Sequence, residues 1–172
     1  MRTTIALAAL AAVAATPTAA QTVAQADLMN REGERIGDVT VQEAVAGGVL
    51  VRLDIDALPA GTHAFHIHAT GACAPPDFTS AGGHLAGDMR HGFMVEGGPH
   101  PGDFPNVRVG ADGELRRTFY NTRLDVGGGE QPILDADGSA VVIHRGPDDY
   151  RSQPAGDAGE RIACGVLEAQ PM

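Results

Sequence analysis

The chain has 172 residues and a net charge of −10, with 22 acidic residues against 12 basic residues, all of which are arginine. This balance excludes proteins that bind nucleic acids or anionic membranes through a basic surface. The length is that of one domain with a substantial core.

Residues 1–20 have the pattern of a secretory signal peptide. Arg2 supplies the positive end, residues 5–15 the apolar stretch, and Thr18-Ala19-Ala20 a cleavage site of small residues. The apolar stretch and every later one are shorter than the roughly twenty residues that a membrane helix needs. We therefore expect an exported protein, residues 21–172, without membrane insertion, and the short signal favours a bacterial periplasm. The alternative is a retained N-terminal anchor, since this end carries a single charge.

Alternating apolar residues predict strands after this segment, at Val39 and Val41, over residues 49–55 and over residues 63–68. Gly47-Gly48 and Pro59-Ala60-Gly61 mark the turns between them. Further strands are expected at residues 107–109, 115–120, 140–144 and 162–167, and we find no helical period. The sequence therefore predicts an all-β sandwich or barrel.

Two long loops, residues 71–106 and 145–160, lie between the predicted strands. Loops of this length are usually functional or disordered. The first contains three histidines and is rich in glycine and proline. The run Gly127-Gly128-Gly129 is interpreted as a flexible turn.

Six of the seven histidines form a pattern typical of two adjoining metal sites. His66 and His68 stand two residues apart on a predicted strand, so both leave the same face, opposite Phe65 and Ile67. An all-histidine site with open access suits copper, whereas tetrahedral nitrogen and oxygen ligation suits zinc. The first long loop can fold such a tetrahedron from His84, His91, His100 and Asp103, and the sixth histidine is His144. A single histidine is more often solvated or hydrogen-bonded, but the repeated pattern reverses that expectation.

Six segments, in order, resemble the copper/zinc superoxide dismutases: GTHAFHIHATGAC (residues 61–73), SAGGH (80–84), RHG around His91, GPHPGDFPN (98–106), DGSAVVIHRGPDD (137–149) and GDAGERIACGV (156–166). The resemblance implies an immunoglobulin-like, eight-stranded Greek-key barrel of two sheets. It also implies dismutation of superoxide to oxygen and hydrogen peroxide by a copper ion that alternates between two oxidation states. Superoxide would be the substrate, and dimers are common in the family, so a homodimer is compatible with the sequence.

The resemblance also assigns roles to individual residues. Arg161 would sit beside the open copper position, and Asp148 would link the copper ligand His66 to the zinc ligand His91. From local sequence alone, Asp148 is better interpreted as an ordinary turn residue. His63 would support the strand without binding metal. Copper would be held by His66, His68, His84 and His144, and zinc by His84, His91, His100 and Asp103, so that His84 is shared and also takes part in proton transfer.

Two cysteines in an exported chain predict one disulfide between Cys73 and Cys164, and both positions match the family's pairing. Two free thiols would suit a reducing cytosol and conflict with the signal peptide. Cysteine ligation of metal is disfavoured because histidines fill both predicted sites.

Three features depart from the family's usual pattern. Leu85-Ala86-Gly87 replaces the segment that normally follows the bridging histidine, and the spacing to His91 is one residue shorter, which makes His91 the least secure zinc ligand. Ala64 replaces a common glycine. The loops have no lysine to guide an anionic substrate, which leaves Arg90, Arg145 and Arg151 as candidates beside Arg161.

Other functions compete with dismutation. A non-catalytic copper-binding protein for buffering or delivery could use the same strand histidines, although it would need neither a bridging imidazole nor Arg161. A superoxide dismutase-like module without copper conflicts with four retained copper histidines. A copper-only variant stays open because the segment before His91 is altered.

Overall fold

A computed structural model describes residues 23–170 of the chain, so the expected signal peptide lies outside the described residues. Within that range the chain forms strands and one 3-10 turn, η1, but no α-helix. The elements are β1 (Val23–Asn30), β2 (Arg35–Glu43), β3 (Val49–Ile55), β4 (Gly61–His63), β5 (Phe65–His68), η1 (Thr79–Ala81), β6 (Val107–Val109), β7 (Leu115–Asn121), β8 (Ala140–His144), β9 (Arg161–Val166) and β10 (Glu168–Gln170).

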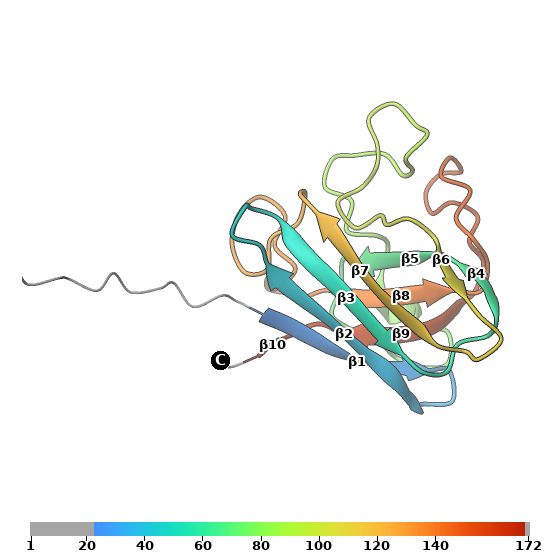
Figure 1. Cartoon of the computed structure of the whole chain (residues 1–172). Helices are drawn as coiled ribbons and strands as arrows, with labels where there is room; N and C mark the ends of the chain where they lie inside the picture. The colour runs from blue at the N-terminus through green and yellow to red at the C-terminus, as the bar shows by residue number, and fades with distance from the viewer. Residues whose placement is uncertain (1–22, 171–172) are drawn as a thin grey trace, which may run out of the picture.

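The strands form a curled antiparallel sheet in the order β5-β8-β9-β1-β2-β3-β7, with β10 also paired to β1. A second, two-stranded ladder joins β4 to β6. Because β4 and β5 follow each other with Ala64 between them, one short segment contributes to both ladders. This arrangement confirms the predicted all-β barrel, whose curl is visible in Figure 1.

The inward faces of the strands form the main core. In β3, Val49, Val51, Leu53 and Ile55 alternate with solvent-facing residues and are fully buried, as the sequence pattern predicts. In β5, Phe65 and Ile67 also face this core, and the Phe65 ring lies 4.5 Å from that of Phe104. The predicted division of β5 into an apolar face and a histidine face is therefore confirmed.

Three details differ from the expected strands. β1 was not predicted, because its inward residues Ala24, Ala26 and Leu28 carry too little apolar bulk for a clear alternation. The expected strand at residues 63–68 is divided into β4 and β5. The last expected strand begins one residue earlier, at Arg161, and β10 follows it.

A second, smaller apolar cluster joins the outer face of β8 and β9 to the first long loop and is formed by Phe78, Ala81, Ala140, Val142 and Cys164. The disulfide between Cys73 and Cys164 closes 91 residues of chain and fixes this loop to β9, as predicted. Both long loops rise on the same side of the barrel, near β4, β5 and β6 (Figure 1). Among residues 23–170, no helix has the length and apolar character to cross a membrane.

Candidate metal centre

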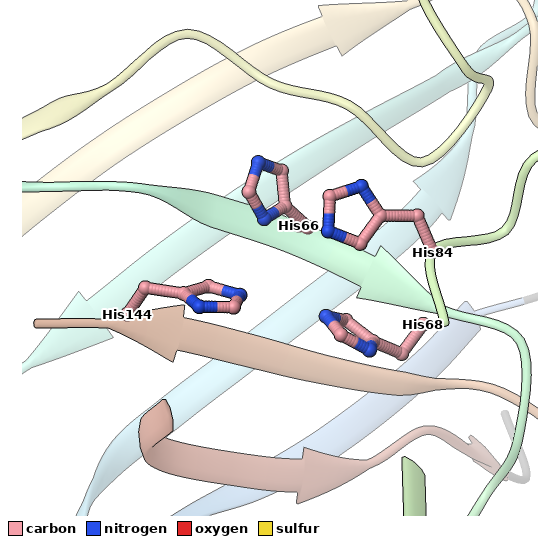
Figure 2. Close-up of side chains that lie close together, drawn as sticks. All are labelled: His66, His68, His84 and His144. Carbon is pink, nitrogen blue, oxygen red and sulfur yellow. The ribbon is translucent and has the colours of Figure 1, made fainter. Parts of the chain in front are cut away.

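Three histidines reach the site from neighbouring strands. His66 and His68 leave the outer face of β5, and His144 ends the adjacent β8 (Figure 2). The antiparallel register pairs His66 with Val142, so His144, two residues further along β8, leaves the same face. The ladder itself therefore sets the spacing of these three side chains.

The fourth histidine, His84, comes from the first long loop, which runs along the free edge of β5. Leu85 N donates to Ile67 O at 2.8 Å, and Ala69 N donates to Gly83 O at 2.9 Å. These bonds form an antiparallel bridge between His84 and His68, and a similar bridge joins Asp103 to His66. Main-chain pairing thus places loop residues beside strand residues.

Each of these four imidazoles has one nitrogen in a hydrogen bond and one without a partner. The bonded nitrogens are His66 Nε2 with Asp148 at 2.9 Å, His68 Nδ1 with Gly82 O at 3.0 Å, His84 Nδ1 with Asp103 at 2.9 Å and His144 Nδ1 with Gly159 O at 3.1 Å. The other nitrogens, His66 Nδ1, His68 Nε2, His84 Nε2 and His144 Nε2, are among the six buried side-chain atoms of the described chain that have no hydrogen-bond partner.

The donor atoms of His66, His68, His84 and His144 lie within 4.8 Å of one another. Buried polar atoms without partners are rare, and four that converge on one point require a common explanation. Figure 2 shows the rings gathered around a shared space above β5 and β8. Copper is one of the cations that imidazole donors suit, so it fits this donor set.

Burial keeps the imidazoles of His66, His68 and His144 neutral, so their lone pairs are available. Desolvation lowers the pKa of His66 to about 4, against a hydrogen bond to Asp148 that acts in the opposite direction. It lowers the pKa of His68 to about 2 and that of His144 to about 3, and the positive charge of Arg161 adds to both shifts.

A second group shares His84 and adds His91, His100 and Asp103, again with donor atoms within 4.8 Å. The Asp103 carboxylate lies 2.9 Å from His84 Nδ1 and 3.1 Å from His91 Nδ1. His100 Nδ1 lies 3.3 Å from this carboxylate but lacks hydrogen-bond geometry. Three imidazoles and one carboxylate form the donor set that tetrahedral zinc accepts.

Asp103 is held as a carboxylate by its surroundings. Burial by itself raises the pKa of this group, but hydrogen bonds from His84 and from the main-chain N–H of Gly92 outweigh burial and leave the pKa below its usual range. Its other oxygen also accepts a hydrogen bond from His100 N at 3.0 Å. The anion is therefore fixed in position by the loop that carries it.

Asp148 links the two groups. Its carboxylate lies 2.9 Å from His66 Nε2 and 3.0 Å from His91 Nε2, and all three side chains are fully buried. Burial raises the pKa of Asp148, but hydrogen bonds from the two imidazoles and from Tyr150 N lower it to about 2. The local turn interpretation of Asp148 missed this contact because the partner histidines are distant in sequence.

Arg161 opens β9 and is the register partner of His144 across a β-bulge. Its guanidinium donates to Phe78 O and to Gly82 O, each at 2.6 Å. These two carbonyls belong to the disulfide-anchored loop, so they fix the cation near His144. A cavity of about 320 Å³ opens beside His144 and is lined by residues of the second long loop.

His63 takes no part in either donor group. Its Nδ1 lies 2.9 Å from His144 O and its Nε2 lies 2.8 Å from Pro59 O. The ring therefore connects the end of β8 to Pro59, and the supporting role expected of His63 stays a prediction. Asn106 and Gln153, whose side chains join the two long loops, could not be identified from the sequence, because local sequence gives no signal for such distant contacts.

Comparison with known proteins identifies the same family that the sequence segments resemble. The family model described as copper/zinc superoxide dismutase (SODC) matches residues 35–167. The chain is 44% identical over 146 residues to the copper/zinc superoxide dismutase 1 of Aquifex aeolicus, covering 83% of this chain and 86% of the relative. It is 43% identical over 141 residues to the Caulobacter vibrioides enzyme of that name, covering 80% of each chain. A crystal structure of a SOD-like protein from Bacillus subtilis matches with a TM-score of 0.79 and 38% identity, covering 84% of this chain and 97% of that one.

Proposed function

Because the chain belongs to the copper/zinc superoxide dismutase family, we propose that it converts two superoxide anions and two protons into oxygen and hydrogen peroxide. Copper would be held by the unpartnered nitrogens of His66, His68, His84 and His144, and zinc by His84, His91, His100 and Asp103. The observation that carries this proposal is the convergence of four buried, unpartnered imidazole nitrogens beside a fixed arginine.

The bound copper would supply reversible one-electron chemistry, and the zinc a fixed positive charge beside it. Arg161 would bind the anionic substrate through its guanidinium, which stays oriented by Phe78 O and Gly82 O. His84 Nε2 is a site where a proton can be held for transfer to the reduced product, because its Nδ1 already faces Asp103.

Asp148 would maintain ring orientation on both sides of the site. One oxygen accepts from His66 and the other from His91, so each imidazole presents its Nδ1 to its own donor group. Such carboxylate partners fix the tautomer and direction of a metal-binding histidine.

We further propose export to a bacterial periplasm as a single domain, residues 21–172, after cleavage of a signal peptide. The disulfide supports an oxidising compartment, and the similar dismutases named above are bacterial proteins. The homodimer expected from the family remains a prediction that light scattering of the purified protein would check.

Metal content and superoxide consumption of the purified protein test the proposed function together. We expect one copper and one zinc per chain and rapid turnover, while a His144→Ala variant should lose copper and activity but retain zinc. Its retained zinc and unchanged circular dichroism serve as the folding control. Bound copper without turnover would instead favour a copper-buffering or delivery protein, and activity without zinc would identify a copper-only enzyme.

A further inference from the structure

The segment that carries His91 has little regular structure of its own. Residues 82–106 form neither a helix nor a strand, apart from isolated bridges at His84 and Asp103. His91 lies between those bridges, in the stretch that is shortened relative to the family. Nevertheless its imidazole is fully buried, with Nδ1 at Asp103 and Nε2 at Asp148. Contacts from elsewhere must therefore hold its main chain.

One side chain from the second long loop satisfies both main-chain groups of His91. Gln153 Oε1 accepts from His91 N at 3.0 Å, and Gln153 Nε2 donates to His91 O at 2.8 Å. The same Nε2 also donates to Arg151 O at 3.0 Å, which fixes the carboxamide within its own loop. This reciprocal pair resembles one rung of an antiparallel ladder, made by a side chain across 62 residues of sequence.

The two loops touch closely enough for such a contact to set position. A Cβ on Gly92, whose φ is +100°, would lie 2.2 Å from Tyr150 O. A Cβ on Gly156, at φ +68°, would lie 1.9 Å from Asp148 Oδ1 and 2.7 Å from His91 Nε2. Both glycines therefore allow main-chain approach that any side chain would block.

A similar pair of hydrogen bonds holds the main chain of Asp148, the carboxylate partner of His91. Asn106, at the end of the first loop, donates from Nδ2 to Asp148 O at 2.9 Å and accepts from Asp148 N at 2.8 Å. The buried contact between His91 and Asp148 is thus flanked by two carboxamides, each of which reaches from one loop to the main chain of the other.

We propose that Gln153 is a positioning residue for the zinc-binding side of the site. By fixing the main chain of His91, its carboxamide keeps Nδ1 directed at the other zinc donors and Nε2 at Asp148. This inference rests on the proposed function for the identity of the metal. The carboxamide compensates for the absence of regular structure around His91.

The test compares Gln153→Ala with Gln153→Glu. Gln153 is exposed apart from its carboxamide contacts, so neither substitution removes core packing. Zinc affinity is measured by competition with a chromophoric chelator, and ligand geometry by the visible spectrum of cobalt placed in the zinc site. Loss of an outer partner of a metal ligand typically lowers affinity about 10- to 100-fold. We expect at least about a tenfold loss with an altered cobalt spectrum for Gln153→Ala.

Gln153→Glu retains the acceptor for His91 N but cannot donate to His91 O, so its loss of affinity should be intermediate. Asn121→Ala is the matched control, because Asn121 Nδ2 ties the same loop through Pro101 O at 2.9 Å without touching His91. It should lower affinity less and leave the cobalt spectrum unchanged. Equal losses in Gln153→Ala and Asn121→Ala, or an unchanged spectrum in Gln153→Ala, would overturn the proposal.

Neither measurement depends on turnover. A wild-type protein that binds zinc and cobalt but consumes no superoxide would disprove the proposed function and leave the role of Gln153 testable. A wild-type protein that binds neither ion would refute the positioning role directly.

Discussion

A buried imidazole is ready to bind a metal when a hydrogen bond fixes one ring nitrogen and the other nitrogen has no partner. His66, His68, His84 and His144 all meet this condition, and their fixed nitrogens use acceptors of different kinds, both carboxylates and main-chain carbonyls. Neutral imidazole is the form that binds, and desolvation maintains it at His66, His68 and His144 in the absence of metal. The site is thus prepared by hydrogen bonds and burial before an ion arrives.

This preparation predicts that the metal-free protein loses stability as the pH falls. The pKa values of His66, His68 and His144 lie well below 6.5 in the folded state, so the unfolded chain binds more protons between pH 6.5 and about 4. Stability therefore decreases with falling pH through that window. We expect a loss of at least about 2 kcal/mol between pH 7.5 and pH 5. Urea unfolding at the two pH values measures this, and a flat profile would contradict neutral buried imidazoles.

Asp148 and Asp103 extend the same trend to lower pH. Their folded pKa values are depressed, so their stabilising contributions are present above the ordinary carboxyl pKa and are lost as the pH falls below it. In an Asp148→Asn variant, the free energy of unfolding should therefore fall less steeply with decreasing pH than it does in wild type. The comparison is made by urea unfolding below pH 4, with wild type measured in parallel.

Arg161 is predicted to affect turnover without affecting metal content. Hydrogen bonds to a charged group contribute about 1.5–3 kcal/mol, so Arg161→Ala should reduce superoxide consumption by about tenfold or more. Its guanidinium donates to main-chain carbonyls and lies outside both donor groups. Measuring the copper and zinc content together with the rate of superoxide consumption separates an effect on turnover from an effect on metal binding. Loss of copper in this variant would show that Arg161 supports the metal site itself.

At the scale of the elements, strands and loops contribute in different ways. β5 and β8 bring three histidines to one face, and this part could be predicted because alternation along a strand is local. β1 could not, since its small inward alanines give a weak pattern. Asp148, Asn106 and Gln153 could not be placed by periodicity either, because their partners lie 42–82 residues away. Only the family resemblance assigned Asp148 its role.

The disulfide should stabilise the barrel and also hold the arginine. Cys73 fixes the loop whose Phe78 and Gly82 carbonyls orient Arg161. In the chain-entropy model, removal of a disulfide that closes so long a loop lowers the free energy of unfolding by about 4 kcal/mol. We expect a Cys73→Ser, Cys164→Ser double variant to unfold at a lower urea concentration. Its activity per bound copper ion should also be lower than that of wild type. Unchanged activity per bound copper would show that Arg161 is held without the crosslink.

For the whole molecule, folding and metal binding should be linked. The donor atoms converge only in the folded barrel, so ions that bind there stabilise the native state. At a free zinc concentration a thousandfold above Kd, the expected gain is about 4 kcal/mol. Calorimetry of stripped and zinc-loaded protein measures the shift in Tm, with Asp103→Ala as the variant that should gain much less. An equal gain in both proteins would place the bound zinc elsewhere.

The order of the strands leaves β5 at one end of the sheet, where its outer main-chain groups would otherwise be open. The first long loop covers this edge through the bonds of Ile67 to Gly102 and Leu85. Uncovered edges are templates for strand addition between molecules, and the segment that prevents this here is the one that carries His84 and Asp103. Resistance to aggregation and retention of metal therefore depend on the same stretch of chain.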